Sequence, residues 1–335
     1  MRKVLVTGGC GFIGSHLVRR LLREHPDLHV VNIDLLTYAG RPENVADVAD
    51  DPRYTFVQGD IANADDVARA ADGVDGIINV AAESHVDRSI MGGDEFITTN
   101  VLGTKRLLDH ARAHELRYLQ VSTDEVYGDV DAPHRSVETD PLHGSSPYAA
   151  SKAAGDLLVQ SYARTFGLNA SITRGSNTYG PYQFPEKLIP LFTTNAFDGK
   201  DLPLYGDGMQ VREMLYVEDH CSAIDLVFHV GAAGEAYNVG AEREVPNIET
   251  ATKIIELTGA DPDSLKRVAD RPGHDRRYAL DCAKLRALGW ERATDFDTGL
   301  ARTVEWFREN RAWWEAIKSG EAFADYAAKN YGARG

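Results

Sequence analysis

The residues best suited to chemistry are Thr123, Asp124 and Glu125, which directly follow the apolar run 118–122. A hydroxyl and two carboxylates at the end of a buried strand can donate, accept and transfer protons. Such residues also end many strands as turn and cap formers without a catalytic role. An elimination would use both acids, because one group must remove a carbon-bound proton while another protonates the departing hydroxyl. The surroundings would then have to separate the two pKa values.

A second reactive pair, Tyr148 and Lys152, begins an expected helix over 148–166. A spacing of four places the phenol and the ammonium on one helical face. We expect the cation to favour the phenolate, which lowers the pKa of Tyr148 and makes it a base for a hydroxyl proton. Lys152 can also bind the ribose of a nicotinamide cofactor. Taken alone, Tyr-x-x-x-Lys is common, and a solvated helical pair would explain it.

A glycine-rich segment, Thr7-Gly-Gly-Cys-Gly-Phe-Ile-Gly14, lies between an apolar run and an amphipathic segment. Gly8, Gly11 and Gly14 permit a tight turn, the close approach of a pyrophosphate and close helix–strand packing. Asp34 follows twenty residues after Gly14, where a carboxylate accepts the ribose hydroxyls of NAD and repels the 2′-phosphate of NADP. The sequence therefore predicts NAD as cofactor.

These residues lie in a chain whose first half alternates short β-rich runs with amphipathic segments. Strands are expected near 4–6, 30–33, 55–57, 76–80, 118–121 and 170–172, and helices near 15–23, 64–71, 96–114 and 148–166. This alternation predicts a doubly wound parallel α/β sheet of the Rossmann type. After Tyr179 the sequence is rich in loops, although 235–239 resembles one more sheet strand. We expect an NAD-binding domain of 1–178 plus about 214–240, and a smaller, interleaved α/β substrate lobe of about 179–213 plus 241–335.

Composition narrows the kinds of partner. The chain has 335 residues, 43% of them hydrophobic, and a net charge of −15, which argues against nucleic acid or an anionic membrane as partner. It has no apolar stretch of the roughly 20 residues that span a bilayer. Its three cysteines are scattered without metal-ligand spacing, so neither a disulfide framework nor a metal site is expected. These features favour a cytoplasmic protein.

The glycine segment, Asp34 and the Tyr148/Lys152 pair together resemble the extended short-chain dehydrogenase/reductase superfamily. Longer segments are similar to the dTDP-glucose 4,6-dehydratase family across nearly the whole chain. They are 36–40 (LTYAG), 81–89 (AAESHVDRS), 123–128 (TDEVYG), 179–190 (YGPYQFPEKLIP) and 271–278 (RPGHDRRY). The last two segments are specific to this family, whereas the glycine and Tyr-x-x-x-Lys motifs are shared by the superfamily.

The resemblance implies a function for each reactive residue. Tyr148 would take the proton of the sugar 4-hydroxyl, with Thr123 hydrogen-bonded to that oxygen, while C4 passes hydride to NAD⁺. Glu125 would then remove the C5 proton, and Asp124 would protonate the leaving 6-hydroxyl. Return of the hydride to C6 and a proton to C5 gives dTDP-4-keto-6-deoxy-glucose with no net oxidation.

The resemblance also implies binding residues, besides Tyr148 and Lys152. We expect the cofactor to contact Gly8, Gly11, Phe12, Ile13, Gly14, Asp34, Leu35, Thr37, Gly40, Asp60, Ile61, Ala81, Ala82, Ser84, Asn100 and Thr178. We expect the sugar nucleotide to contact Ser84, Thr123, Asn177, Lys187, Leu188, Pro203, Tyr205, Arg212, Asn247, Arg271 and His274. His85 and Arg88 are expected to structure their loop. A homodimer is implied, with helices near 96–114 and 148–166 forming a four-helix bundle.

Three positions depart from the family pattern. Gly175 replaces a usual cysteine, Thr178 a usual asparagine, and Arg41 stands where asparagine is common. Thr178 lacks the amide donor, which puts its cofactor contact in doubt.

Three other functions fit parts of this pattern. A UDP-glucuronic acid decarboxylase also oxidises C4 but then loses CO₂, and serine usually occupies its position equivalent to Asp124. A C4 epimerase would lack both acids, at 124 and at 125. A non-catalytic NAD-binding protein of the same fold would be expected to have lost Tyr148 or Lys152.

Overall fold

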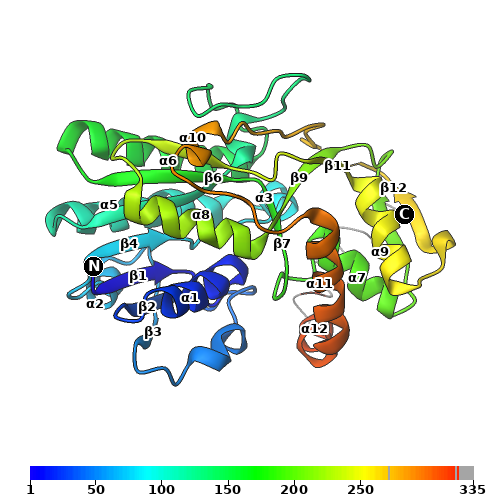
Figure 1. Ribbon diagram of the computed structural model, residues 1–335, viewed down its shortest axis with the longest axis horizontal. Coiled ribbons are helices and arrows are strands. Elements are labelled where there is room, and N and C mark those ends of the chain that lie inside the picture. Colours follow the sequence, from blue (N-terminus) through cyan, green and yellow to red (C-terminus); the bar gives the residue numbers. More distant parts are fainter. Residues whose placement is uncertain (271, 321–322, 324–335) are drawn as a thin grey trace.

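A seven-stranded parallel sheet forms the centre of the computed structural model, which describes residues 1–270, 272–320 and 323 (Figure 1). Its strands, in spatial order, are β10 (Ala236–Val239), β6 (Ala170–Gly175), β5 (Arg117–Thr123), β4 (Gly76–Asn79), β1 (Lys3–Thr7), β2 (His29–Asp34) and β3 (Tyr54–Gln58). Every neighbouring pair is parallel, and the strand order reverses between β1 and β4. The predicted doubly wound sheet is therefore confirmed, including the late strand at 236–239.

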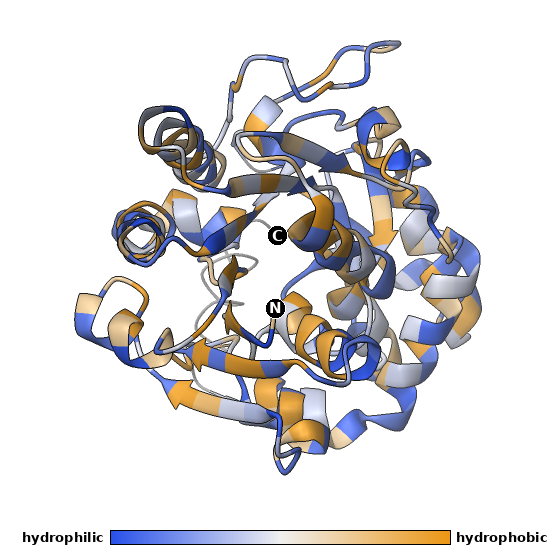
Figure 2. Cartoon of the chain, turned by 60° about the vertical axis from the view of Figure 1, so that its left-hand side comes forward, coloured by the Kyte–Doolittle hydropathy of each residue, from blue (hydrophilic) through white to orange (hydrophobic). Residues whose placement is uncertain are grey.

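Helices cover both faces of the sheet because each buries one apolar stripe against it. On one face lie α1 (Phe12–Glu24) and α8 (Val217–Val230); on the other lie α2 (Ala64–Ala70), α5 (Thr104–Ala113) and α6 (Pro147–Phe166). In α1 the buried positions Leu17, Val18 and Leu21 recur at helical spacing. Figure 2 shows the apolar strands lying between these helices.

The segment 96–114, expected as one helix, contains a change of helical type. Helix α4 (Asp94–Ile97) leads into a π-helical turn, η2 (Thr98–Gly103), before α5 begins. Asn100 lies in this turn and is buried. Its side chain donates to the backbone oxygen of Glu83 at 2.9 Å and to the hydroxyl of Ser151 at 2.9 Å. π-helical turns are often found at functional sites.

Most of the remaining elements build a further apolar cluster beside the sheet. It is formed largely by α7 (Leu188–Phe197), α9 (Asn247–Thr258), α11 (Phe296–Glu309) and α12 (Arg311–Lys318), with β8 (Leu202–Tyr205) and β9 (Val211–Tyr216). Short strands complete two small sheets: β12 (Leu265–Val268) pairs with β8, while β7 (Asn177–Tyr179) and β11 (Glu244–Pro246) flank β9. Short helices are η1 (Pro42–Val48), α3 (Val86–Met91), η3 (Asp124–Tyr127), η4 (Pro262–Ser264) and α10 (Ala283–Arg286). The domain boundaries given above remain predictions.

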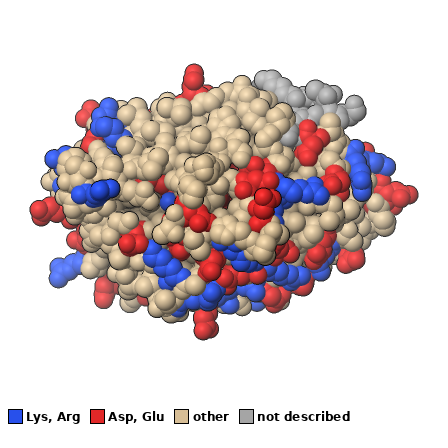
Figure 3. All heavy atoms as spheres, turned by 90° about the horizontal axis from the view of Figure 1, so that it is seen from above, with Lys and Arg blue, Asp and Glu red and all other residues tan. Residues whose placement is uncertain are grey.

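The helices and the charged surface bear on whether a membrane or a nucleic acid is a partner. Within the part of the chain that the structure describes, no helix is long and apolar enough to cross a membrane. On the face seen in Figure 3, Lys and Arg side chains alternate with Asp and Glu rather than forming one basic patch.

Candidate functional site

Two adjoining cavities lie at the carboxyl ends of the sheet strands. Residues at or just after the ends of β1, β2, β4 and β5 line the larger one, which we call the cofactor cavity. Residues of α7, β8, β9 and the start of α9 line much of the smaller one, which we call the outer cavity. Glu125, Asn177, Glu186 and Lys187 line both cavities, so a ligand can extend from one into the other. Ligands of doubly wound sheets bind along this edge.

The glycine segment forms a cradle with no space for side chains. Gly8 has a φ of +68°, and a β-carbon added there would lie 2.7 Å from the α-carbon of Ala81. A β-carbon on Gly14 would lie 2.1 Å from the carbonyl oxygen of Gly8. Helix α1 begins directly after this turn, with Gly11 as its N-cap residue. The cradle thus fits a pyrophosphate, which backbone N–H groups at a helix N-terminus can bind.

Asp34 is fixed at the end of β2 by two backbone donors. Its Oδ2 accepts from the backbone N–H of Cys10 at 2.9 Å, and its Oδ1 accepts from that of Leu36 at 2.8 Å. Burial raises the pKa of the carboxyl group, and these two hydrogen bonds oppose that rise. Asp34 lines the cofactor cavity, where a carboxylate fits the ribose hydroxyls of a dinucleotide.

The two acids after β5 have different surroundings. Asp124 is 2% exposed, and its Oδ1 accepts a hydrogen bond from the Thr123 hydroxyl at 3.2 Å. Burial raises its pKa well above the usual range, and the nearby carboxylates of Glu125 and Glu213 raise it further. A raised pKa suits a carboxyl group that acts as a proton donor. Glu125 lines both cavities, whereas Asp124 lines neither and lies behind them.

Tyr148 and Lys152 lie together in the cofactor cavity, but one expectation about them is wrong. Burial raises the pKa of Tyr148, and the charge of Glu125 adds to the rise. Lys152 Nζ donates to the backbone oxygen of Val121 at 2.7 Å, and burial lowers its pKa to about 8. The pKa of Tyr148 is therefore raised, opposite to the direction that the helical spacing predicted. A hydrogen bond from Thr123 lowers the pKa of Tyr148 and offsets part of this rise.

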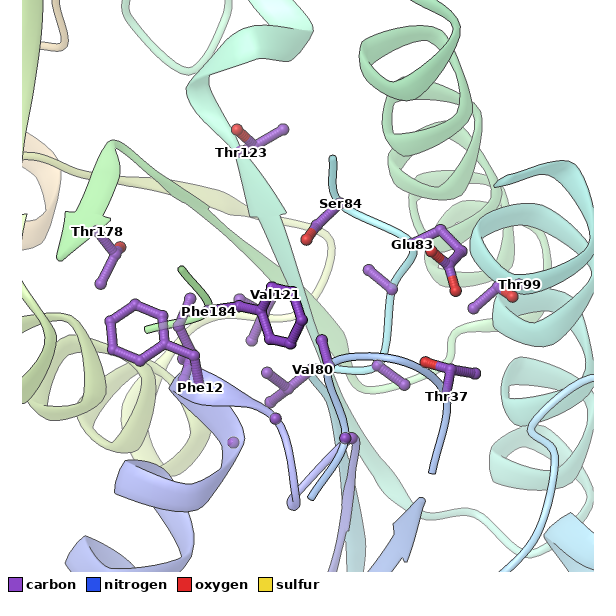
Figure 4. Close-up of a pocket in the computed structure, with 18 of the residues that line it drawn as sticks. Phe12, Thr37, Val80, Glu83, Ser84, Thr99, Val121, Thr123, Thr178 and Phe184 are labelled. Carbon is purple, nitrogen blue, oxygen red and sulfur yellow. The ribbon is translucent and has the colours of Figure 1, made fainter. Parts of the chain in front are cut away.

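All but one of the residues expected to contact the cofactor line the cofactor cavity. The exception is Asn100, which lies behind the cavity wall and holds the 81–84 loop through Glu83. Figure 4 shows Phe12, Val80, Val121 and Phe184 around the middle of the cavity, with Thr123 at one end and Thr37 at the other.

The residues expected to contact the sugar nucleotide divide between the cavities. Ser84 and Thr123 line the cofactor cavity, and Asn177 and Lys187 line both. The outer cavity also holds Leu188, Pro203, Tyr205, Arg212, Asn247 and His274. Arg271 lies outside the described residues. Arg212 stacks on Tyr278, with its guanidinium carbon 4.3 Å from the ring centroid.

Gly175 and Thr178, which depart from the family pattern, both lie against the buried side chain of His220. A β-carbon on Gly175 would lie 2.5 Å from Cε1 of His220, so only glycine leaves room for the ring in this position. The Thr178 hydroxyl donates to the Ser176 backbone oxygen at 3.1 Å and lies 2.7 Å from His220 Nδ1. The hydroxyl thus already has two protein partners, which limits any further hydrogen bond from Thr178 to a cofactor.

Several residues that line the cavities were not anticipated. Tyr38, Glu83, Glu186, His220 and Tyr278 all line one or both cavities. Tyr38, Glu83 and Glu186 fall within the family-like segments 36–40, 81–89 and 179–190, and Tyr278 ends the segment 271–278, which was the available signal for these four. His220 lies in none of the family-like segments. The only hint of it in the sequence was glycine at 175, where a side chain would leave no space for the histidine ring.

The loop residues His85 and Arg88 behave as expected and also reach the site. His85 is the N-cap residue of α3, and its Nδ1 accepts from the backbone N–H of Arg88 at 3.4 Å. The Arg88 guanidinium pairs with buried Glu186 at 3.1 Å and lies 3.9 Å from the ring centroid of Tyr38. Loops 36–40, 81–89 and 179–190 are thereby joined.

Comparison with known proteins identifies the family to which the chain belongs. The family model described as GDP-mannose 4,6 dehydratase matches residues 5–303. The dTDP-glucose 4,6-dehydratase of Streptomyces niveus is 49% identical over 323 residues, covering 95% of this chain and 96% of that protein. The chain belongs to the dTDP-glucose 4,6-dehydratase family. A crystal structure of a member of the family from Streptomyces venezuelae, determined with NAD bound, is 53% identical, with a TM-score of 0.92 and coverage of 94% and 100%.

The same fold also serves other reactions. The UDP-glucose 4-epimerase of Thermus thermophilus, solved with NAD, is 32% identical, with a TM-score of 0.85 and coverage of 92% of this chain and 99% of that one. The fold alone therefore does not decide the reaction, and the side chains after β5 must do so.

Proposed function

We propose that this protein dehydrates dTDP-glucose to dTDP-4-keto-6-deoxy-glucose, as an NAD-dependent hydro-lyase. The observation that carries the proposal is the pair of acids after β5. Asp124 is a buried carboxyl group with a raised pKa, and Glu125 beside it lines the junction of the two cavities. An elimination needs one group to donate a proton and another to accept one.

The cofactor cavity fits NAD by its own geometry. The crowded glycines at 8 and 14 leave no space for side chains between the backbone and a bound pyrophosphate, and Asp34 lies where a ribose would follow. Relatives of this chain have been crystallised with NAD. Bound NAD supplies a reversible hydride acceptor, so the sugar is oxidised at C4 only transiently.

The chain's own residues would handle the protons. Tyr148 takes the proton of the 4-hydroxyl, with Thr123 hydrogen-bonding the same oxygen. The resulting 4-ketone makes the C5 proton acidic enough for Glu125 to remove. Asp124 protonates the departing 6-hydroxyl, which requires its carboxyl group to reach the cavity wall that it now lies behind. Catalytic hydrogen bonds often tighten only when substrate is bound.

The sugar nucleotide would occupy the outer cavity. Lys187, Arg212 and His274 line it and offer donors that suit a diphosphate, in a chain whose net charge of −15 would otherwise repel the ligand. The lining also includes Leu188, Pro203 and Tyr205, against which a base and sugar can pack.

The competing functions fit these residues less well. A decarboxylase has no departing hydroxyl for an acid at position 124 to protonate, and an epimerase needs neither acid. A non-catalytic protein would not be expected to keep both Tyr148 and Lys152 buried in the cavity.

Product analysis with three substrates tests the proposal. Purified protein without added NAD is incubated separately with dTDP-glucose, UDP-glucose and UDP-glucuronate. We expect a 4-keto-6-deoxy product from dTDP-glucose and no net NADH. Inactivity with dTDP-glucose combined with CO₂ release from UDP-glucuronate would replace the proposal with the decarboxylase.

We also infer a homodimer and a cytoplasmic location from the resemblance and the composition. Large apolar side chains are exposed on the helices expected to pair, including Ile97 at 57% and Leu157 at 57%. A second copy covering them would explain this exposure. Size-exclusion chromatography with light scattering distinguishes a dimer from a monomer, and Leu157→Glu should shift the dimer toward monomer.

A further inference from the structure

A compact group of metal-binding side chains lies away from both cavities. His25 is the C-cap residue of α1, and Asp225 and His229 lie in the last two turns of α8. One ligand atom from each of the three lies within 4.8 Å of the others, and no other such group occurs among the described residues. At least 200 positions separate His25 from the other two, so motif spacing in the sequence could not reveal the group.

The three side chains already converge on one oxygen atom. Asp225 Oδ1 lies 2.9 Å from His25 Nε2 and 3.1 Å from His229 Nδ1. The two imidazole rings are stacked, with centroids 4.6 Å apart. Ligand atoms that bind one zinc ion at about 2.0–2.1 Å in tetrahedral geometry lie about 3.4 Å apart. Small side-chain rotations would therefore admit an ion.

The carboxylate is held in place for this contact. Asp225 is buried, and its Oδ2 accepts from Arg20 Nε at 3.0 Å, which leaves Oδ1 directed at the histidines. A partner that orients a ligating carboxylate is usual in metal sites. His25 and His229 are each about one-third exposed, so an ion can enter from solvent.

The neighbouring charges are nearly balanced. Arg20 offsets Asp225, and Arg23 pairs with Glu24 at 2.8 Å. Arg117 binds the last carbonyl oxygens of α8 through Val227, Phe228 and Gly231. The two ion pairs cancel, so Arg117 and the N-terminal ammonium leave a small positive excess that a dication must overcome.

We propose that His25, Asp225 and His229 form a binding site for a divalent transition-metal ion of the zinc class. The ion joins the C-terminal ends of α1 and α8, the two helices that pack on one face of the sheet (Figure 1). Three protein ligands leave one position for water, so the ion is exchangeable. The ends of α1 and α8 lie opposite the glycine cradle, so the ion stabilises the fold without taking part in the reaction.

A proton competes with the ion for the same ring nitrogen. His229 Nδ1 lies 2.9 Å from the backbone oxygen of Asp225, which only a protonated nitrogen can hydrogen-bond. Metal must displace that proton, and binding is expected to be tighter at pH 8 than at pH 6.

Thermal unfolding of the full chain with EDTA, Zn²⁺ or Co²⁺ tests the proposal. We expect Zn²⁺ to raise the Tm by several degrees and Co²⁺ to give ligand-field absorption in the visible range. His25→Asn and His229→Asn should each abolish both effects. His114→Asn is the matched control, because its ring lies 4.3 Å from that of His110 in a second surface pair, and it should change neither.

The outcomes separate a metal site from a hydrogen-bonded ion cluster. No Tm shift and no Co²⁺ absorption in the unsubstituted protein would overturn the proposal, as would effects that persist in His25→Asn. If a variant does not fold, competition between the unsubstituted protein and a colorimetric zinc chelator decides, with one tightly bound equivalent expected and none contradicting it.

Discussion

The imidazole of His220 lies directly against Gly175, where a β-carbon would be 2.5 Å from Cε1 and 2.6 Å from Nε2. His220 is buried, and its Nδ1 is 2.7 Å from the hydroxyl of Thr178. Two departures from the family pattern, at 175 and 178, are thus parts of one packing arrangement.

Gly175→Ala is expected to destabilise the fold by about 1–3 kcal/mol, the usual cost of overpacking a tight site. Urea unfolding measures the change. Gly92→Ala is the matched control, since a β-carbon there meets nothing within 4 Å. Adding His220→Ala to Gly175→Ala should recover part of the loss, and strictly additive costs would show that the two positions do not interact.

His220 is also expected to contribute to acid sensitivity. Burial lowers its pKa to about 4, from an ordinary value near 6.5. Between these values the unfolded chain binds the proton and the folded chain does not, so stability falls as the pH drops from about 6.5 to 4. His220→Gln keeps a polar partner for Thr178 and should remove about 2–3 kcal/mol of this fall. Parallel pH profiles of unfolding for the two proteins would contradict this.

The order of strands and helices in the sheet could be predicted from the sequence, because hydrophobic periodicity and glycine positions depend only on neighbouring residues. The cradle at 8–14 and Asp34 were correctly predicted to lie at one sheet edge for that reason. The pKa of Tyr148 was not predictable, because it depends on burial and on Glu125 rather than on helical spacing. Similarly, the pair of Arg88 with Glu186 joins positions nearly 100 residues apart. Asn100 hydrogen-bonds the backbone of Glu83 from the π-helical turn, and its expected contact with the cofactor stays a prediction.

Asp124→Asn preserves the shape of the side chain and removes its acidic proton. Oxidation at C4 should persist, while loss of water slows by about 10²–10⁴, the usual contribution of a general acid. Single-turnover measurements of bound NADH and of product separate these steps. Product formation within a few fold of the unsubstituted rate would show that Asp124 is not the acid.

Glu125→Gln should stop the reaction after C4 oxidation, at removal of the C5 proton. With no base for the C5 proton, the 4-ketone forms and cannot eliminate, so bound NADH is expected to accumulate on addition of dTDP-glucose. Tyr148→Phe is the contrasting variant, because it should prevent C4 oxidation and give no NADH signal. Normal turnover by Glu125→Gln would remove that residue from the mechanism.

The most direct test of the proposed dehydration is isotopic. The purified protein is incubated with dTDP-glucose in deuterated water without added NAD, and the product is examined by NMR. Removal of the C5 proton by Glu125 and its later replacement predict a 4-keto-6-deoxy sugar that carries deuterium at C5, with no net NADH. A 4-keto-6-deoxy product without deuterium at C5, or no product at all, would contradict the account.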